Sequence, residues 1–219
     1  MNTTILYCSS GREKPDFERR IINSLIKVSG KLPIVSVTQK PVDLGNNICV
    51  GDVGVSGFNF FRQILIGLKK INTKFVISAE ADCLYPENYF DFVPPRDDVC
   101  YRANKVCIMP DGRDYFFYKE GGSTLGQIVG RNFYLSTLEK LFEGAPEWSI
   151  EEKNFPKERH HQSDIFKKIE RWDPPAPIIS FKTHRGMRYY THSDRTPIHE
   201  LPYWGSGTKL RNYYFHGIK

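Results

Sequence analysis

Two carboxylates, Glu80 and Asp82, are the residues of this 219-residue chain best placed to do chemistry, and only Ala81 separates them. They follow an apolar run at 75–78 that has the composition of a buried strand. Side chains at positions i and i+2 of an extended chain point to the same side, so both carboxylates can reach one ion. Mg²⁺ and Mn²⁺ prefer such oxygen ligands and commonly bridge them to substrate phosphates. The pattern predicts a divalent-metal site, although a polar strand end without any ion has the same pattern.

An alternation of strands and helices is expected to position this pair. Short apolar runs predict strands at 4–8, 32–38 and 75–78. Apolar residues at helical spacing predict a helix from Pro15 towards Gly30 and another at 59–70. This βαβ-type order predicts an α/β fold with a mostly parallel central sheet flanked by helices. Ligands of such sheets gather beyond the carboxyl ends of the strands, which is where the acidic pair lies.

The rest of the chain is less regular. The segment 45–57 is rich in Gly and Asn and is expected to be a loop. The tail from His184 to Lys219 shows little periodicity. Further elements are expected as follows: strands within 99–109 and 114–118, a short helix at 136–142, and a helix starting near Ser163 that buries Ile165, Phe166 and Ile169.

Composition places the chain among globular proteins with a substantial core. It contains 15 Phe, 12 Tyr and 3 Trp, which argues against a mainly disordered chain. The net charge is +6, and residues from Glu151 onward hold 13 Lys and Arg against 8 Asp and Glu. This basic last third is consistent with a phosphate-bearing ligand or a polyanion, and equally with a solvated basic face that has no specific partner.

Cysteine usage and hydropathy favour a cytoplasmic protein. The five cysteines are odd in number and include no Cys-x-x-Cys pair, which favours reduced thiols over disulfides or a zinc site. No apolar run is long enough to cross a bilayer, and the first residues lack the pattern of a signal peptide. There is no Walker loop, Gly-x-Gly-x-x-Gly fingerprint or Gly-x-Ser-x-Gly elbow. Their absence argues against kinase, dehydrogenase and serine hydrolase functions.

The order of these elements and the acidic strand end resemble the GT-A class of nucleotide-sugar glycosyltransferases, particularly the family-2-like group. The resemblance covers roughly residues 3–173, and its most specific part is the helix 59–68 followed by 75–82. It implies a single-domain, Rossmann-like GT-A fold over 1–219. Residues 1–98 would form the nucleotide-sugar-binding half. Residues 99–219 would form the acceptor-binding half and a C-terminal tail.

The resemblance also implies which residues hold the metal and the donor. Asp82 would bind Mn²⁺ or Mg²⁺, and Glu80, where the family commonly has Asp, would contact the metal or the nucleotide. UDP is the implied nucleotide, and the sugar would be a hexosyl or pentosyl group. Gln39 stands where many relatives have an acidic residue, and Arg12 suits a phosphate by its chemistry. The donor-site residues expected on this basis are Ser9, Ser10, Gly11, Arg12, Thr38, Gln39, Arg62, Glu80, Ala81, Asp82 and Arg185.

Two late segments would supply the remaining chemistry. Asp164 is the expected general base for an acceptor hydroxyl, although its position also suits a helix cap, and His160 or His161 could take the role instead. His184 would complete the metal site, with His192 as its rival. The nearby cations Arg185 and Arg188 would then steady the departing diphosphate.

The acceptor is expected to be a hydroxyl group. Segment 199–211 resembles the tail of small phage-type glycosyltransferases, some of which modify hydroxymethylated pyrimidines in DNA. Basic and aromatic residues interleave in the tail, as nucleic-acid-binding surfaces require. The acceptor-binding residues expected are Arg131, His161, Arg188, Tyr189, Tyr203 and Trp204. A saccharide acceptor, a nucleotidyltransferase and a non-catalytic nucleic-acid-binding domain are the alternatives.

Overall fold

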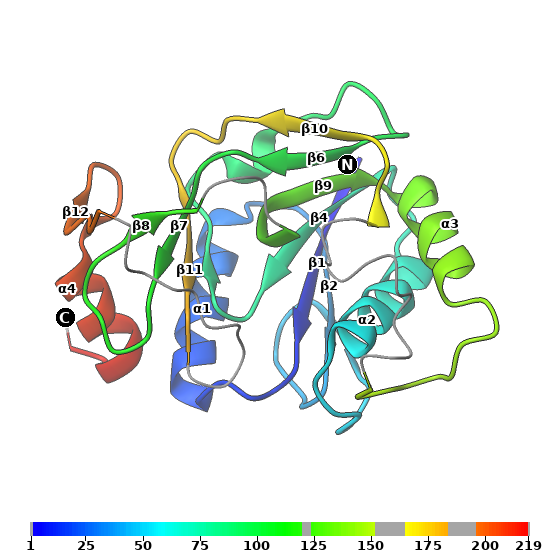
Figure 1. Cartoon of the computed structure of the whole chain (residues 1–219), viewed down its shortest axis with the longest axis horizontal. Coiled ribbons are helices and arrows are strands. Elements are labelled where there is room, and N and C mark those ends of the chain that lie inside the picture. Colours follow the sequence, from blue (N-terminus) through cyan, green and yellow to red (C-terminus); the bar gives the residue numbers. More distant parts are fainter. Residues whose placement is uncertain (1, 120–123, 152–164, 184–195, 219) are drawn as a thin grey trace.

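A seven-stranded mixed sheet, in the order β10-β6-β9-β4-β1-β2-β3, runs through the computed structural model (Figure 1). The structure describes residues 2–119, 124–151, 165–183 and 196–218. β3, β2, β1 and β4 are mutually parallel, β9 is antiparallel to both β4 and β6, and β10 is parallel to β6. The strands are β1 (Thr3–Ser9), β2 (Ile34–Thr38), β3 (Asn46–Cys49), β4 (Phe75–Glu80), β6 (Cys100–Ala103), β9 (Gln127–Gly130) and β10 (Ile169–Trp172).

A second, smaller sheet has the order β5-β11-β7-β8, and β12 pairs with β13 in a separate hairpin. The main-chain N–H of Phe181, at the end of β11, donates to the Asp82 carbonyl over 2.8 Å. The small sheet therefore delivers the residues after β11 to the carboxyl end of β4. These strands are β5 (Cys83–Leu84), β7 (Val106–Met109), β8 (Phe117–Tyr118), β11 (Ile178–Phe181), β12 (Glu200–Leu201) and β13 (Gly205–Ser206).

Helices cover both faces of the large sheet because alternate β1 residues are apolar on both sides. Ile5 and Tyr7 pack with α1, whereas Leu6 and Cys8 pack with α2. In Figure 1, α2 and α3 lie side by side on one face. On the other side, α1 also contacts the small sheet. The helices are α1 (Pro15–Val28), α2 (Gly57–Lys70), α3 (Arg131–Leu141) and α4 (Gly207–Arg211), with a π-helical turn at Asn212–His216 and 3₁₀ turns at Tyr89–Asp91 and Thr124–Gly126.

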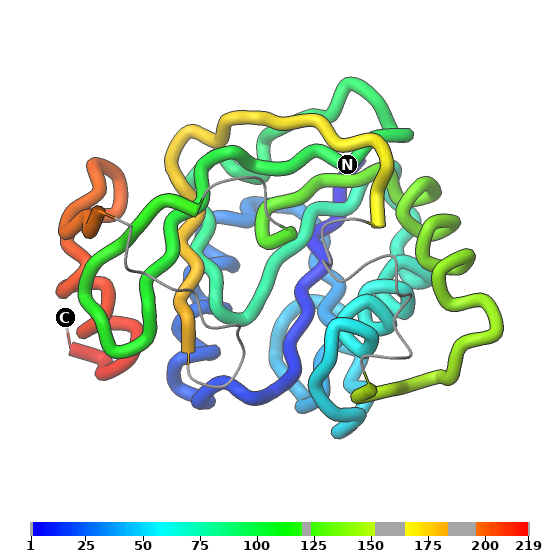
Figure 2. The backbone as a smooth tube through the Cα atoms, viewed as in Figure 1, coloured from blue at the N-terminus to red at the C-terminus, as the bar shows by residue number. Residues whose placement is uncertain are grey.

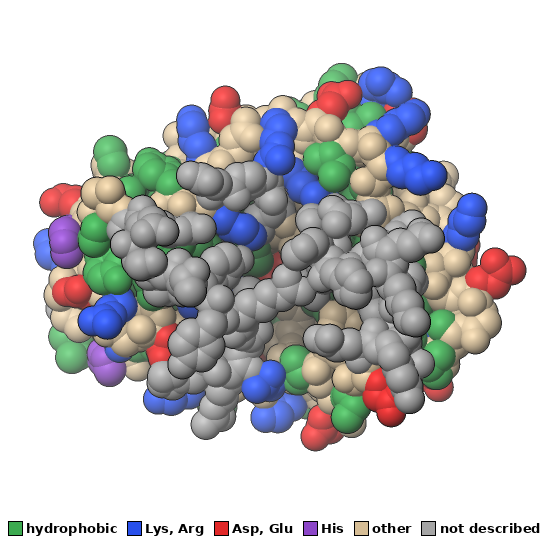
Figure 3. Space-filling model, viewed as in Figure 1, with side chains coloured by type: hydrophobic (Ala, Val, Ile, Leu, Met, Phe, Trp, Pro, Cys, Tyr) green, Lys and Arg blue, Asp and Glu red, His purple; other side chains and the backbone are tan. Residues whose placement is uncertain are grey.

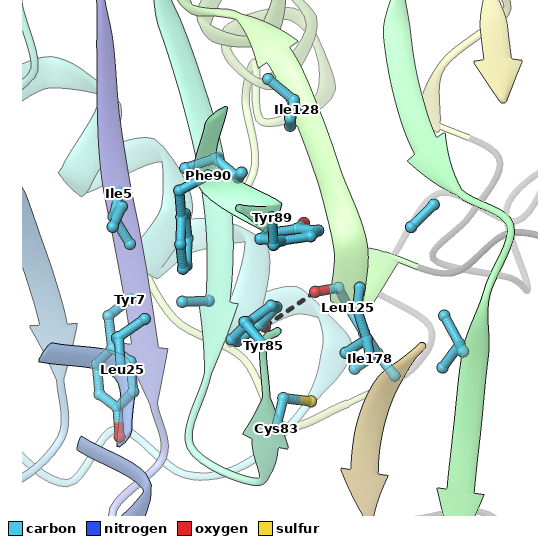
Figure 4. Packing of buried hydrophobic residues seen from close by; sticks show 14 of the residues in the cluster. Ile5, Tyr7, Leu25, Cys83, Tyr85, Tyr89, Phe90, Leu125, Ile128 and Ile178 are labelled. Atoms are coloured by element: carbon cyan, nitrogen blue, oxygen red, sulfur yellow. Dashed lines mark hydrogen bonds between the residues drawn. The ribbon is translucent and has the colours of Figure 1, made fainter. Parts of the chain in front are cut away.

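An aromatic cluster holds the carboxyl end of β4 in place. Tyr85, Tyr89 and Phe90 pack against one another beside β4 (Figure 4). The Tyr85 hydroxyl donates to the Leu125 carbonyl over 2.9 Å and accepts from the Glu80 main-chain N–H over 3.1 Å. A buried hydroxyl that satisfies both of its hydrogen-bonding functions holds its partners in place. The main chain of Glu80 is therefore fixed by the core.

The C-terminal segment, red in Figure 2, lies against the green segment that contains β7 and β8. Phe116 forms an antiparallel bridge with Ile198, and the Thr208 hydroxyl bonds the Asp114 carboxylate over 2.9 Å. Arg20 of α1 donates to the Tyr214 carbonyl over 3.0 Å. These contacts join the C-terminal segment to both the small sheet and α1. Within the described residues, no helix has the length and apolarity needed to cross a membrane.

The expected α/β fold, with a mostly parallel central sheet flanked by helices, is confirmed, and so are the strands and helices of the first half. Three expectations there need correction. Segment 45–57 contains strand β3. The second strand begins at Ile34 rather than at Leu32. Ile26 is half exposed, because α1 turns that position away from both sheets.

The second half departs further from expectation. Segment 99–109 contains two strands, β6 and β7, which belong to different sheets. Helix α3 begins at Arg131, five residues before the expected start. Ile165 and Phe166 are buried as expected, but Ile169 lies in edge strand β10 and not in a helix. β11 and α4 lie where no element was expected.

Candidate functional site

A cleft of about 360 Å³ lies at the carboxyl ends of β1, β2 and β4. The three strands are parallel and adjacent, so the residues that follow them meet at one edge of the sheet. The structure brings most of the expected donor-site residues into the lining of this cleft: Ser9, Ser10, Arg12, Gln39, Glu80, Ala81 and Asp82.

The acidic pair Glu80 and Asp82 lines the cleft where β4 ends. One side-chain ligand atom each from Glu80, Asp82 and Cys83 lie within 4.8 Å of one another. The Cys83 thiol donates to the Asp82 carboxylate over 3.4 Å. Burial, reinforced by the two carboxylates, raises the pKa of this thiol well above its usual value. A neutral thiol is a poor partner for Mg²⁺ or Mn²⁺, so Glu80 and Asp82 are the residues suited to hold such an ion.

Glu80 ionises with difficulty in the protein without an ion. Burial, and next the neighbouring Asp82 carboxylate, raise the pKa of Glu80 to about 8, while Lys182 and Lys119 oppose the shift. A divalent cation beside the carboxylate would favour its charged form and reverse this balance. The arrangement therefore favours a proton on Glu80 that a divalent cation would displace.

Two charged residues that sequence reasoning did not select lie near the acidic pair: Glu13 lines the cleft, and Lys182 lies beside Asp82. The Lys182 ammonium is 3.8 Å from an Asp82 carboxylate oxygen, and its side chain is 9% exposed. Glu13 lines the cleft and accepts a hydrogen bond from the Thr183 hydroxyl over 2.8 Å. Burial raises the pKa of Glu13. The signal for Lys182 and Thr183 was the apolar run 178–181 before them, which is strand β11.

The turn after β1 is shaped by a side-chain contact and one glycine. The Ser9 hydroxyl oxygen accepts from the Gly11 N–H over 3.0 Å, and Gly11 has a φ of +65°. A Cβ at this position would also approach Cγ of Lys40 to 2.9 Å. Glycine suits both constraints, and the resulting turn leads the chain to Arg12 at the cleft.

The opposite rim is held by the start of α2. Ser56 caps α2 by accepting from the Asn59 N–H, and its hydroxyl donates to the Ser149 carbonyl over 2.6 Å. The Asn59 side chain bonds the Val53 and Gly54 carbonyls and accepts from the Ser149 N–H. Two of these hydrogen bonds, Ser56–Ser149 and Asn59–Ser149, join residues 93 and 90 positions apart and fix this rim.

Gln63 ties together two of the strands that end at the cleft. Its side-chain amide donates to the Ser9 carbonyl over 3.0 Å and to the Val37 carbonyl over 2.8 Å. The side chain is 2% exposed. We expect Gln63→Leu to lower the free energy of unfolding by about 1–3 kcal/mol, because two buried carbonyls each lose one hydrogen-bond donor. Urea unfolding measures the change, and Asn23→Leu on the exposed side of α1 should stay within about 0.5 kcal/mol.

An unchanged unfolding free energy in Gln63→Leu would show that the two hydrogen bonds of the Gln63 amide contribute no net stability.

Thr38 and Arg62 were expected at the donor site but point elsewhere. The Thr38 hydroxyl is buried and accepts from the Asn47 amide over 2.9 Å. The Arg62 guanidinium lies 4.0 Å from the centre of the Phe142 ring and donates to the Pro146 carbonyl. Arg62 projects from another side of α2 than Phe60 and Gln63, which do line the cleft. The structure therefore does not bring Arg62 to the donor site.

The expected acceptor residues within the described chain lie outside the cleft. Arg131 donates to the Leu68 carbonyl and lines a pocket with Asn2 at the amino ends of the parallel strands. That is the opposite end of the sheet from the acidic pair. The Tyr203 hydroxyl accepts from the Glu87 N–H, and the two aromatic side chains Tyr203 and Trp204 line a pocket beside α1.

The other expected site residues lie outside the described residues: Asp164, His160, His161, His184, Arg185, Arg188, Tyr189 and His192. Their roles stay predictions. On the face shown in Figure 3, the coloured basic side chains along the edge are interspersed with acidic ones. That view gives no extra support to a polyanion over a small phosphate-bearing ligand.

No protein-family model and no curated protein sequence matches the chain. Solved structures do resemble it. S. aureus TarS 1–349 in complex with UDP-GlcNAc has a TM-score of 0.51 and 14% identity over 84% of this chain and 59% of that chain. The glycosyltransferase GlyE in Streptococcus pneumoniae TIGR4 has a TM-score of 0.52 and 10% identity over 84% and 55%. The chain thus spans little more than half the length of these proteins. It has the mixed α/β, GT-A-like glycosyltransferase fold, with a large, mostly parallel central sheet flanked by helices.

Proposed function

We propose that the chain is a metal-assisted glycosyltransferase that binds a nucleoside-diphosphate sugar, with UDP as the nucleotide, in the cleft at the carboxyl ends of β1, β2 and β4. The observation that carries the proposal is the convergence of Glu80 and Asp82 in the same cleft as Ser9, Ser10 and Arg12. Acidic ligands for a cation and donors for phosphate are thereby combined in one place. The UDP-GlcNAc bound by TarS, which has a similar fold, supports the choice of nucleotide.

In this proposal Glu80 and Asp82 hold Mn²⁺ or Mg²⁺, which when bound would neutralise charge on the diphosphate leaving group. Arg12 lies where its guanidinium can bind a phosphate in bidentate fashion. The acceptor oxygen forms a bond to the anomeric carbon as the bond from that carbon to the phosphate oxygen breaks. Asp164 takes the acceptor proton, and the nucleoside diphosphate leaves. His184, Arg185 and Arg188 are proposed to complete the metal and diphosphate contacts.

The acceptor is proposed to be a hydroxyl group, either on a saccharide or on a hydroxymethylated base in DNA. In the described residues, Tyr203 and Trp204 line a pocket apart from the donor cleft, so stacking of a base by this pair would occur away from the acidic residues. We therefore favour the saccharide. A transfer assay with radiolabelled UDP sugar and the two acceptor classes decides between them.

The first test is thermal unfolding with UDP, GDP, dTDP and their sugars, each with and without Mn²⁺. We expect UDP with Mn²⁺ to raise the melting temperature by several degrees, because a ligand at about one hundred times its dissociation constant stabilises the folded state by about 2.7 kcal/mol. Neither UDP nor Mn²⁺ alone should match the pair.

Three other outcomes separate the alternatives. Stabilisation by DNA alone, without dependence on metal or nucleotide, would contradict the proposal and favour a nucleic-acid-binding domain. A larger response to nucleoside triphosphates, with release of pyrophosphate, would favour a nucleotidyltransferase. Binding of UDP that is indifferent to Mn²⁺ would contradict the metal site.

A further inference from the structure

Hydrogen bonds of Lys182 and of its two neighbours in sequence fix the main chain of Lys182 near the acidic pair, Glu80 and Asp82. Its main-chain N–H donates to the Met109 carbonyl over 2.8 Å. The preceding N–H, of Phe181, donates to the Asp82 carbonyl over 2.8 Å, and the following Thr183 hydroxyl bonds Glu13 over 2.8 Å. The main chain at Lys182 therefore has little freedom, and its side chain is directed by the same hydrogen bonds that join β11 to the loop after β4.

The ammonium group of Lys182 is buried, and the described residues offer it no hydrogen-bond acceptor. Its side chain is 9% exposed, and within the described part of the chain its Nζ makes no hydrogen bond. The Asp82 carboxylate oxygen, at 3.8 Å, attracts it but is beyond hydrogen-bonding distance. An ammonium has three donors, and burying it is costly unless anionic acceptors surround it. The position therefore suits an anion with several oxygens.

The charges at the cleft identify the class of that anion. With a divalent cation bound, Glu80 and Asp82 are both ionised, and together with the cation and the Lys182 ammonium they carry one net positive charge. The diphosphate of a nucleotide sugar carries two negative charges and offers oxygens to both cations. Without the ammonium, the cation and the two carboxylates would cancel, and among the described residues that line the cleft only Arg12 would attract phosphate.

We propose that Lys182 binds the diphosphate of the donor, and that in the donor-free protein its ammonium group competes with the divalent cation for Asp82. This inference rests on the proposed function. It adds Lys182 to the donor site and predicts how the binding of the metal depends on the donor. The metal alone binds weakly because it meets a fixed positive charge. The diphosphate removes this repulsion by bridging the ammonium and the metal, so metal and donor bind cooperatively.

The test measures two affinities whose changes should have opposite signs. Lys182→Met keeps the aliphatic stem and removes the charge, and Lys182→Gln is a second variant in case the first folds poorly. We expect either variant to bind Mn²⁺ alone about fivefold more tightly, because a repelling charge is gone. At saturating Mn²⁺, both should bind UDP at least about tenfold more weakly, because a charged hydrogen bond to phosphate is lost.

Calorimetry with Mn²⁺, UDP and inorganic pyrophosphate supplies these values. Lys140→Met, which removes a lysine from the exposed side of α3, should change none of them. Lys182→Arg keeps the charge and should keep the weak binding of Mn²⁺ alone. Pyrophosphate reports on the ammonium independently of the nucleotide base, so a protein that binds no nucleoside diphosphate still tests the inference.

A purely structural lysine would weaken Mn²⁺ and diphosphate together, and that result overturns the inference. Unchanged affinities in both variants also overturn it. Wild-type protein that binds Mn²⁺ and pyrophosphate with the expected Lys182 dependence, but no nucleoside diphosphate, would support the inference and contradict the proposed donor.

Discussion

Asp82→Ala is expected to abolish the joint binding of Mn²⁺ and UDP and to lower sugar transfer by at least about a thousandfold, because a metal that stabilises the leaving group contributes several kcal/mol. Asp82 contacts the small sheet through its main-chain carbonyl, which alanine keeps. Its side chain is 16% exposed, and its contacts are the polar ones with the Lys182 ammonium and the Cys83 thiol. We therefore expect the fold to survive while the site is lost.

Calorimetric titration of UDP in Mn²⁺, beside a far-ultraviolet circular dichroism spectrum, separates loss of binding from loss of fold. Glu139→Ala is the matched control, because it removes a carboxylate from the exposed side of α3, away from the cleft. The control should bind UDP as the wild type does. Undiminished binding and turnover in Asp82→Ala would rule out the metal role of the acidic pair.

The first half of the fold was predictable because its signals are local and repeated. In α2, Phe61, Ile64 and Leu68 recur at helical spacing and all are buried. β4 is a continuous apolar run that the parallel sheet buries on both faces. Such elements can be recognised from their own sequence. The rule that ligands gather at the carboxyl ends of parallel strands then predicted the place of the cleft.

The second half was not predictable in the same way because its strands are short and their partners are distant. Ile165, Phe166 and Ile169 have a spacing that also suits a helix, yet Phe166 is buried by packing on Phe133 and Tyr134 of α3. Ile169 sits on edge strand β10, which pairs with a strand almost seventy residues earlier. The pattern of apolar residues within a four-residue strand carries no information about a pairing strand so far away in the sequence.

The residues of the candidate site also differ in whether local sequence signals predict their positions. Ser9, Gln39 and Asp82 follow strands whose order was apparent, and they do meet at the cleft. Lys182 approaches Asp82, and Thr183 bonds Glu13, only because β11 joins a second sheet, and that pairing has no local signature. Arg62 was expected at the cleft from its helix, but the direction of each α2 side chain is set by the helical turn, and Gln63 takes the inward position.

The stability of the metal-free protein should depend on pH through Glu80. The folded pKa of this carboxyl is raised to about 8, above the value of about 4.3 for an unperturbed glutamate. The folded state therefore binds more protons than the unfolded state between these values, and its stability falls as pH rises across that window. Below about pH 4.3 the effect is absent, and above about pH 8 it is complete.

Glu80→Gln removes this dependence because the amide carries no charge at any pH. We expect the variant to match the wild type near pH 4.5 and to exceed it by up to about 3 kcal/mol at pH 8.5, in line with a pKa raised by several units. Urea unfolding of the metal-free proteins at four pH values measures the difference. Glu139→Gln, on the exposed side of α3, should follow the wild type throughout.

Adding Mn²⁺ should invert the ranking at pH 8.5. The wild type gains stability from the ion because both carboxylates are then ionised and coordinated, whereas Glu80→Gln has lost one charged ligand and gains less. At pH 5.5 the wild type holds a proton on Glu80, so Mn²⁺ should stabilise it less than at pH 8.5. A wild-type gain that does not grow with pH would mean that Glu80 is ionised before the ion arrives, and the burial of Glu80 beside Asp82 would then not control the metal.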